Sequence, residues 1–489
     1  MTDYNYDIGV LGGGAAGLTV ASGAAQLGAK TILIEKEKTL GGDCLHYGCV
    51  PSKTLIHSAK IYHQIKTAQL LGLPKINVPP AEFQTIAQRI AAVIAKIQKH
   101  DSVERFCKLG AKVEFGQATF TDDHTVELEG RPITAKNWII ATGSSPAIAT
   151  IDGLKETPYL TNRDIFTLEK LPQRLIILGA GPIGIEMAQA FNRLGSSVTV
   201  VDKAFQILTK EDQDMADQVQ EVLAAEGVSF QLNTAILKVS KNGAEKTVLL
   251  KGPDETTFQI TAESILVAMG RSPNVADLGL DQIGIEYDRF GIKVDQRLRT
   301  NQKHIFAAGD VNGGYQFTHV AGYEGSIVVS NAVFHLPRKT DYTWLPWCTY
   351  TEPELASIGM NEKKARAKGI EPRVWIEPFI ANDRSLAEGE TKGCIKLLLD
   401  QKDKPIGVQI FGPRAGDLIS EWVAMLNSGA KLSTIAGAIH PYPTLGEINK
   451  KVAGDLFSPK IFSDPIRKTL KFFFNFKGRA CTPQKIPKT

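Results

Sequence analysis

The sequence predicts an α/β protein in which two parallel-sheet domains are followed by a separate C-terminal α+β domain. Two glycine-rich turns, each between a short apolar strand and a helix, predict the first two domains, and a change of pattern from residue 342 onward predicts the third. Hydrophobic residues make up 43% and charged residues 22% of the 489 residues. This composition is typical of globular chains and excludes disordered, collagen-like and coiled-coil proteins.

The first glycine-rich turn, Gly12-x-Gly14-x-x-Gly17, follows an apolar strand and opens a helix. A second strand over 31–34 leads to Glu35. Strand, turn, helix, strand and acid in this order are typical of a dinucleotide-binding unit. The helix N-terminus would hold a pyrophosphate close to the glycine backbone, and the acid would accept hydrogen bonds from a ribose.

The same pattern recurs at Gly179-x-Gly181-x-x-Gly184, and its second strand leads to Asp202. It predicts a strand over 174–178, a helix over 185–194 and a strand over 197–201. Two such units predict two bound dinucleotides, and two dinucleotides suggest electron transfer between them. One working site beside a relic is the alternative, but both acids and all six glycines are present.

The most specific segment is 41–53, in which Cys44 and Cys49 lie five residues apart. We expect them to open a helix, where the helix N-terminus lowers thiol pKa values and favours the thiolate. Such a pair can form a reversible disulfide and pass two electrons from a bound flavin to an outside acceptor. A stabilising disulfide or two inert thiols would be the structural alternative. The other four cysteines are scattered, which argues against a secreted disulfide framework.

Taken together, these motifs resemble those of the class I FAD-dependent pyridine nucleotide–disulfide oxidoreductases. This family includes dihydrolipoamide dehydrogenase, glutathione reductase and mercuric reductase. The resemblance covers about 5–455, nearly the whole chain. Besides the two glycine turns and the cysteine segment, the matching motifs are Ala141-Thr142-Gly143, 300–310 and 351–359.

The resemblance implies that NAD(P)H passes electrons through FAD to a Cys44–Cys49 disulfide. It assigns Cys49 to the flavin as a thiolate charge-transfer partner and Cys44 to exchange with substrate. Lys53 and Glu186 match an ion pair near the flavin; the alternative is two surface side chains. The implied cofactor-binding residues are Gly12, Gly14, Gly17, Glu35, Lys53, Thr142, Gly143, Gly179, Gly181, Gly184, Asp202, Gly270 and Asp310, the last at the ribityl chain of FAD. No resident metal is expected.

The acid after the second unit indicates which nicotinamide cofactor is used. An acid at this place accepts the 2′-hydroxyl of NAD and repels a 2′-phosphate. Asp202 holds this place, and Lys203 follows it and could soften the preference. The sequence therefore favours NAD(H) over NADP(H).

The segment 438–447 departs from the family pattern. By resemblance, it serves the active site of the partner subunit in a homodimer and supplies a proton-shuttling histidine and a glutamate. Glu447 is retained, but Tyr442 stands where the histidine is expected, and His440 lies two residues upstream. Tyrosine has a reference pKa of about 10, against about 6.5 for histidine, so a phenol is a poor base at neutral pH. Alternatively, Tyr442 only packs and His440 transfers the proton, since residues i and i+2 share a face in extended chain.

The tyrosine favours a mercuric reductase-like enzyme, because those enzymes carry a tyrosine there and a soft metal ion needs no such proton shuttle. An unidentified disulfide is a further possible acceptor. Two departures weaken the metal assignment: the tail has only Cys481 where mercuric reductases carry a cysteine pair, and no N-terminal metal-binding domain precedes the first strand. A dihydrolipoamide dehydrogenase is the first alternative. A redox-sensing or electron-carrier flavoprotein that acts through a partner protein is the second.

Five segments are predicted: an FAD-binding domain in two parts (1–150 and 276–341), an NAD(P)-binding domain (151–275), a dimerisation domain (342–455) and a basic aromatic tail (456–489). The first part should hold a helical region over about 51–109 and strands over about 111–140. The tail carries eight basic residues and one acid. It could lie on an anionic membrane surface, but a helix that packs on the body of the protein is the preferred interpretation.

The charge and the N-terminus bear on partners and location. The net charge of +4 is too small to indicate a nucleic-acid partner. The N-terminal residues have no basic segment and no long apolar run, so no signal peptide is expected. No stretch approaches the roughly 20 apolar residues of a membrane-spanning helix. The sequence therefore predicts a cytoplasmic protein.

Overall fold

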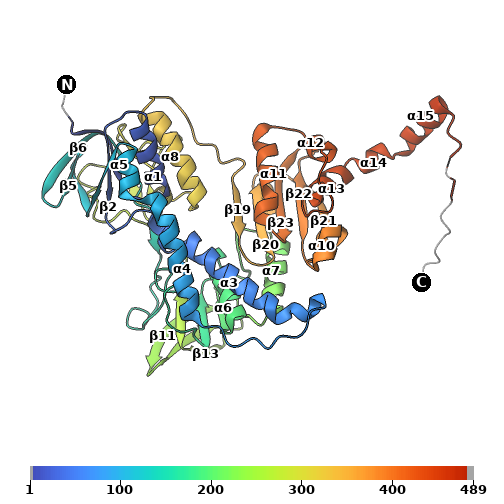
Figure 1. Ribbon diagram of the computed structural model, residues 1–489, viewed down its shortest axis with the longest axis horizontal. Helices are drawn as coiled ribbons and strands as arrows, with labels where there is room; N and C mark the ends of the chain where they lie inside the picture. The colour runs from blue at the N-terminus through green and yellow to red at the C-terminus, as the bar shows by residue number, and fades with distance from the viewer. Residues whose placement is uncertain (1–3, 479, 482–489) are drawn as a thin grey trace. The chain divides into compact units, whose positions relative to one another are not determined.

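The computed structural model describes residues 4–478 and 480–481, which form two compact units. The first unit contains the described residues up to 343 together with 349–352. The second contains 344–348 and the described residues from 353 onward. In Figure 1 the first unit runs from blue to yellow and the second from orange to red. The predicted boundaries at residues 150, 275 and 341 stay predictions.

The first unit contains a seven-stranded sheet. Its strands run in the order β3 (Ala111–Phe115), β2 (Thr31–Glu35), β1 (Tyr6–Leu11), β6 (Arg131–Ile140), β5 (Thr125–Leu128) and β4 (Ala118–Asp122), and β18 (Ile305–Ala307) pairs with β6. The pairs from β3 to β6 and the β18–β6 pair are parallel, whereas β4, β5 and β6 pair antiparallel. Parallel strands buried on both faces read as continuous apolar runs, as β2 does.

Helices cover one face of this sheet and a long connection covers the other. α1 (Ala15–Gln26) and α8 (Thr318–Ala332) lie side by side on one face (Figure 1). Apolar side chains of 278–292, which include β16 (Tyr287–Asp288) and β17 (Gly291–Ile292), pack against the opposite face. The core is therefore split into two layers by the sheet.

The second glycine-rich unit forms an all-parallel four-stranded sheet. Its order is β10 (Ser229–Gln231), β9 (Ser197–Val201), β8 (Arg174–Leu178) and β14 (Ser264–Val267), with helices α6 (Pro182–Leu194) and α7 (Gln213–Ala225). An antiparallel sheet of β11 (Ala235–Asn242), β12 (Glu245–Lys251) and β13 (Thr257–Ala262) follows. Both predicted strands have the predicted bounds. The helix starts three residues earlier than predicted, because the first turn of a helix tolerates the missing N–H of Pro182.

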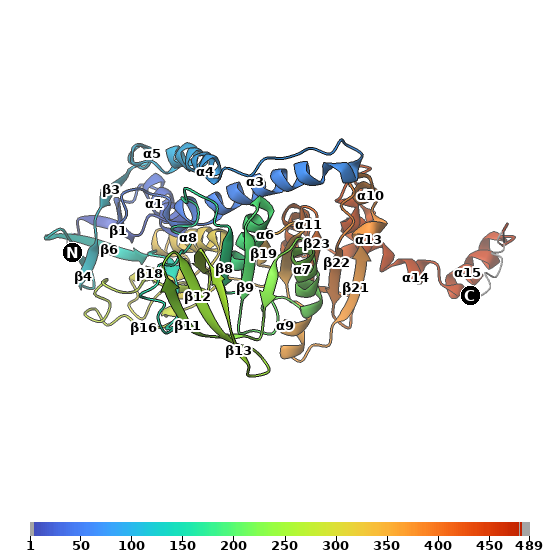
Figure 2. The same cartoon turned by 90° about the horizontal axis from the view of Figure 1, so that it is seen from below.

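The predicted helical region over 51–109 is interrupted. It contains α3 (Cys49–Thr67), η1 (Ala68–Leu71), α4 (Phe83–Gln98), η2 (Lys99–Asp101) and α5 (Val103–Lys108), and α2 (Gly42–His46) precedes it. Residues 73–82 are not helical. Three prolines lie in this stretch, and proline removes a helical N–H and clashes with the preceding turn. α3 packs along α6 (Figure 2). Short elements complete the unit: β7 (Ser144–Pro146), β15 (Arg271–Pro273) and η3 (Asp310–Asn312).

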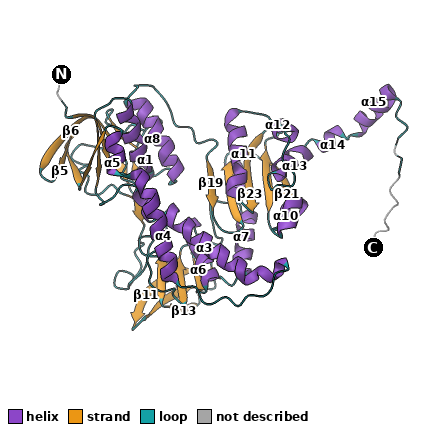
Figure 3. Ribbon diagram, viewed as in Figure 1, coloured by secondary structure: helices purple, strands orange, loops and turns teal. Residues whose placement is uncertain are grey.

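The second unit is the predicted α+β domain (Figure 3). Its sheet has the order β19 (Pro346–Thr349), β20 (Glu354–Gly359), β23 (Pro405–Gly412), β22 (Cys394–Leu399) and β21 (Arg373–Pro378). The helical elements are α9 (Glu362–Ala367), η4 (Phe379–Ala381), α10 (Asp383–Glu388), α11 (Ala415–Ser428), α12 (Leu432–Gly437), α13 (Glu447–Asp455), α14 (Ser458–Ile461) and α15 (Asp464–Phe474). In its core the indole N–H of Trp422 donates to Asn449 at 2.8 Å, so these two buried polar groups are paired.

The structure contradicts the preferred prediction for the tail. No residue of α15 is buried, so the prediction that this helix packs on the body of the protein is wrong. Three of the tail's predicted basic residues, Arg479, Lys485 and Lys488, lie outside the described residues. Within the described chain, every helix is too short or too polar to cross a membrane.

Candidate active site

The first glycine turn closes tightly against the neighbouring strand. Gly12 has a φ of +105°, and a Cβ on it would lie 2.4 Å from the carbonyl oxygen of Ala141. A Cβ on Gly17 would lie 1.8 Å from the carbonyl oxygen of Gly12. Only glycine satisfies both positions. The turn therefore brings bare backbone to the N-terminus of α1, where a pyrophosphate binds well.

The second glycine turn repeats this geometry. Gly179 has a φ of +113°, and its Cβ would lie 2.3 Å from the carbonyl oxygen of Ala268. A Cβ on Gly184 would lie 2.0 Å from the carbonyl oxygen of Gly179. Among the residues described, neither α1 nor α6 has a side-chain cap at its N-terminus. The first backbone N–H groups of both helices thus suit an anion, and nothing in the geometry marks the second turn as a relic.

Both predicted acids bind their own turn in the same way. The carboxylate of Glu35 accepts the N–H of Gly13 at 2.6 Å. It also accepts the N–H of the residue two positions after Glu35, at 2.7 Å. The carboxylate of Asp202 accepts the N–H of Ala180 at 2.7 Å. It also accepts the N–H of the residue two positions after Asp202, at 2.8 Å. Each acid is therefore locked at the end of its strand, next to the glycines.

The two cysteines lie on consecutive helices. Cys44 is within α2, and Cys49 is the first residue of α3, so only Cys49 has the predicted place at the start of the longer helix. Gly48 lets the connection close, because its Cβ would lie 3.1 Å from the Cα of Cys44 and 3.0 Å from the carbonyl oxygen of Asp43. Both cysteines are free thiols, so the structure is that of the reduced pair.

The reduced pair is electrostatically asymmetric. A hydrogen bond from Cys44 lowers the pKa of Cys49 to about 6; desolvation opposes the shift, and the Thr318 hydroxyl and the Lys53 cation assist it. The Thr318 oxygen lies 3.5 Å from the Cys49 sulfur. The same hydrogen bond and burial raise the pKa of Cys44. At neutral pH Cys49 therefore carries the negative charge and Cys44 keeps its proton.

Lys53 and Glu186, which lie 133 residues apart, form an ion pair of 2.8 Å. The Glu186 carboxylate is buried and also accepts the backbone N–H of Tyr350 at 2.9 Å. The Lys53 ammonium lies 4.4 Å from the centre of the Tyr350 ring. Glu186 is thus no surface carboxylate, and the pair holds a cation one helical turn from Cys49.

Replacement of Lys53 by methionine should raise the pKa of Cys49 by about 1 pH unit, because it removes a cation that favours the thiolate. The rate of iodoacetamide alkylation of reduced Cys49 against pH measures this pKa, and Cys49 is exposed to the reagent. The thiolate forms as pH rises through the pKa, so the alkylation curve should move to higher pH.

Lys60→Met is the matched control, because Lys60 lies on the same helix but pairs with Glu352. It should leave the alkylation curve in place, and Lys53→Arg should restore it. An unchanged midpoint in Lys53→Met, with alkylation assigned to Cys49 by mass spectrometry, would contradict the role of the Lys53 charge.

A polar network missed by the sequence analysis joins Asp310 to the cysteine segment. The carboxylate of Asp310 accepts the Ser144 hydroxyl at 2.5 Å and lies 3.7 Å from the Arg271 guanidinium. Arg271 also pairs with Asp43 at 3.0 Å. Burial raises the pKa of Asp310, while Ser144 and Arg271 oppose the shift. The one available signal was adjacency, since Arg271 follows the predicted Gly270 and Asp43 precedes Cys44.

Thr142, Gly143 and Gly270 are the other predicted cofactor residues of this region. The Thr142 hydroxyl donates to the carbonyl oxygen of Asn274 at 2.8 Å. Gly143 and Gly270 have φ values of +71° and +118°, and open space surrounds the place of a Cβ on each. Because β7 and β15 pair antiparallel, the segments after Gly143 and Gly270 lie next to each other.

The C-terminal candidates each have a different hydrogen-bond partner within the second unit. The Tyr442 hydroxyl donates to Asp383 on α10 at 3.0 Å, and its side chain is 71% exposed. His440 Nε2 lies 3.0 Å from a carboxylate oxygen of Glu421 on α11. Glu447 accepts a backbone N–H three residues upstream at 3.3 Å. The hydrogen bond with Asp383 raises the pKa of Tyr442, so its phenol stays neutral at pH 7.

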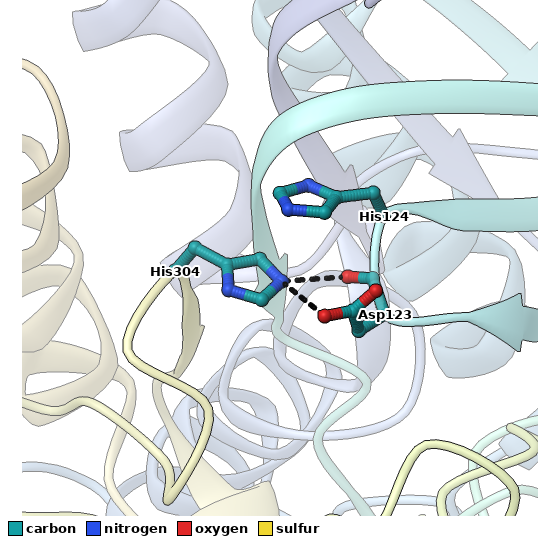
Figure 4. Close-up of side chains that lie close together, drawn as sticks. All are labelled: Asp123, His124 and His304. Atoms are coloured by element: carbon teal, nitrogen blue, oxygen red, sulfur yellow. Dashed lines mark hydrogen bonds and ion pairs between the residues drawn. The ribbon is translucent and has the colours of Figure 1, made fainter. Parts of the chain in front are cut away.

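Asp123, His124 and His304 form a separate cluster of possible metal ligands (Figure 4). The two imidazole rings stack with centroids 4.0 Å apart and planes 17° apart. His304 Nε2 already lies 2.8 Å from the carbonyl oxygen of Asp123, and His124 Nδ1 lies 2.9 Å from that of Ala135. Lone pairs in nearly parallel ring planes do not converge on one ion. The cluster is therefore a stacked, hydrogen-bonded contact between the turn that joins β4 to β5 and the segment that precedes β18.

Two family descriptions match this chain. The pyridine nucleotide-disulphide oxidoreductase family matches residues 6–325, and the dimerisation domain of that family matches residues 345–453. The chain belongs to the pyridine nucleotide-disulphide oxidoreductases. The match confirms the predicted fold class and family, and the dimerisation domain supports a homodimer.

Known relatives of this oxidoreductase carry names that refer to different substrates. It is 32% identical over 447 residues to a mercuric reductase of Staphylococcus aureus, covering 91% of this chain and 81% of the relative. It is 37% identical over 452 residues to a dihydrolipoyl dehydrogenase of Geobacillus stearothermophilus, covering 91% and 94%. Among solved structures, the HOCl-induced flavoprotein disulfide reductase RclA of Escherichia coli superposes with a TM-score of 0.82 at 28% identity, covering 92% and 99%.

The oxidoreductase uses FAD and NAD(P)H, as predicted. The site fits this pair of cofactors: two turns are closed to side chains, two helix N-termini lack a side-chain cap, and an acid is locked beside each turn. The protein is thus an FAD-dependent pyridine nucleotide–disulfide oxidoreductase.

Proposed function

We propose that this oxidoreductase transfers two electrons from NADH to a soft metal ion bound by the thiolates of Cys44 and Cys49. For mercury, NADH and Hg²⁺ would give NAD⁺, H⁺ and Hg⁰. A mercuric reductase among the relatives supports this acceptor class. The observation that carries the proposal is the neutral Tyr442 phenol at the place of the family's base.

The two turns divide the cofactors between them in this proposal. The first turn, Glu35 and Asp310 hold FAD, which supplies a two-electron relay between NADH and the cysteines. The second turn and Asp202 hold NADH, and the Asp202 carboxylate disfavours the 2′-phosphate of NADPH. The Lys53–Glu186 pair keeps a positive charge beside the Cys49 thiolate.

The proton requirement separates a metal ion from a dithiol. A dithiol substrate needs a base to take its proton, which Tyr442 does not provide at neutral pH. Within its own unit, His440 has Nε2 against Glu421 and Nδ1 3.4 Å from a backbone carbonyl oxygen, so both ring nitrogens are occupied. A soft metal ion displaces thiol protons on binding and needs no side-chain base, even though the pKa of Cys44 is raised.

One contact favours dihydrolipoamide dehydrogenase activity as a second candidate. The His440–Glu421 pair has the form of a general base oriented by a carboxylate. If His440 released one of its contacts, it could accept a proton from a dithiol. Lipoamide is therefore the acceptor to compare with the metal ion.

The deciding experiment is NADH oxidation by the FAD-loaded protein, with Hg(II) in excess thiol or with lipoamide as the acceptor. The proposal predicts rapid Hg(II)-dependent turnover that is lost in Cys44→Ala and kept in Cys107→Ala, an exposed cysteine outside the pair. Turnover with lipoamide alone would overturn it in favour of the dehydrogenase. Slow turnover with both would favour an electron carrier that acts through a partner protein.

A further inference from the structure

The tail helix α15 exposes an unusual concentration of large apolar side chains. Phe472, Phe473 and Phe474 are 82%, 71% and 64% exposed, and Phe476 just beyond the helix is 55% exposed. A soluble surface normally carries such residues singly. A group of four aromatic rings within five residues therefore marks an interaction surface.

Four apolar side chains of α15 form one stripe, and the basic side chains lie beside it. Ile466, Leu470, Phe473 and Phe474 are spaced i, i+4, i+7 and i+8, which forms one stripe along a helix. Arg467, Lys468 and Lys471 occupy the neighbouring face by the same geometry. Helices with an aromatic face beside a lysine- and arginine-rich face lie in the interface of a lipid bilayer.

Three lysines of the tail are available to an external anion. Among the described residues, no carboxylate pairs with Lys468, Lys471 or Lys477, and Asp464 is the only acid in α15. A positive face next to an apolar face complements a surface that presents anionic groups above hydrocarbon. Anionic phospholipid has this chemistry, and each lysine near such a surface contributes to binding.

A second copy of the chain is less well supported as the occupant. The match to the dimerisation domain ends at residue 453, eleven residues before α15 begins at Asp464. The tail therefore lies outside the part of the chain that the family uses to dimerise. Like charges on two copies of the basic face would also repel each other.

We propose that α15 and Phe476 form a surface anchor that binds the oxidoreductase to membranes containing anionic phospholipid. The apolar stripe enters the boundary between headgroups and hydrocarbon, and Lys468 and Lys471 lie against the headgroups. The anchor would hold the protein at the membrane surface without a spanning helix.

Co-sedimentation of the FAD-loaded full chain with vesicles tests this anchor. The protein should bind vesicles that contain phosphatidylglycerol, bind pure phosphatidylcholine vesicles much more weakly, and be released by high salt. The double variant Lys468→Gln/Lys471→Gln should bind about thirtyfold more weakly. Phe473→Ser/Phe474→Ser should lose at least about tenfold in binding, because both rings leave the apolar stripe.

Phe290→Ser is the matched control, since Phe290 is an exposed phenylalanine of the first unit. It should bind vesicles as the native chain does, and all variants should keep their NADH-driven activity in solution. Equal binding to neutral and anionic vesicles would overturn the proposal, as would full binding by the phenylalanine variant. A native dimer that this variant dissociates in sedimentation velocity would assign the tail to a second copy instead.

Discussion

Replacement of either Cys44 or Cys49 by alanine should lower NADH-driven reduction of the acceptor by about 10³-fold or more, because a single thiol neither binds the metal ion between two thiolates nor re-forms a disulfide. Steady-state NADH oxidation with the acceptor measures this loss. FAD content should stay unchanged in both variants, since neither cysteine lies in the glycine turns.

The two variants should differ when the remaining thiol is titrated. Cys44→Ala removes the hydrogen bond that lowers the pKa of Cys49 most, but Thr318 and Lys53 remain. The pKa of Cys49 should then lie between about 6 and its ordinary value. In Cys49→Ala, Cys44 loses the neighbour whose hydrogen bond and charge raise its pKa, so that pKa should fall.

Alkylation against pH distinguishes these outcomes. Cys107→Ala serves as the control, because it removes an exposed thiol that takes no part in the pair. If Cys49→Ala kept most of its turnover, the acceptor would be reduced without the pair, and the assignment of both sulfurs would be wrong.

The two glycine turns were predictable because each is a local feature. A strand of about five residues, a turn that only glycine can form and an acid some 20 residues later all lie within one short stretch of sequence. The strands at 174–178 and 197–201 have the predicted bounds for this reason. The repeated contact of Glu35 and Asp202 with their own turns shows how the same pattern yields the same geometry twice.

Long-range partners were beyond a single sequence. Thr318 lies 269 residues from Cys49, and nothing in the local pattern of either residue links the two. The pairing of Lys53 with Glu186 was expected only through family resemblance, whereas the link from Asp43 to Arg271 was missed. Polar contacts of this kind depend on the packing of distant elements, which hydrophobic periodicity does not encode.

For the tail, the local sequence was informative, but it could not identify what the apolar side chains contact. Its basic and aromatic residues were visible in the sequence, but such a composition does not say what covers the apolar side chains. Burial of α15 on the protein and exposure of α15 to a lipid surface require the same alternation of residues. The structure separates the two by the exposure of the phenylalanines.

Tyr442→His should change the acceptor, because the proposed function rests on the lack of a base at this position. A histidine at this place, with a reference pKa of about 6.5, can accept the proton of a dithiol, which a neutral phenol does not accept. Activity with lipoamide should rise by about 10²–10⁴-fold, the usual contribution of a general base. The gain should appear as pH rises through about 6.5, since only the neutral imidazole accepts a proton. Asp383, which now accepts the Tyr442 hydroxyl, would orient the new ring.

Tyr442→Phe is the control for this change, because it removes the hydroxyl without adding a base. It should leave activity with lipoamide as low as in the native protein, which assigns any gain in Tyr442→His to the imidazole. If the native protein and Tyr442→Phe instead turned over lipoamide rapidly and equally, the base would lie elsewhere. His440→Gln should then abolish that activity, because His440 is the other histidine of this segment and Glu421 already orients its ring.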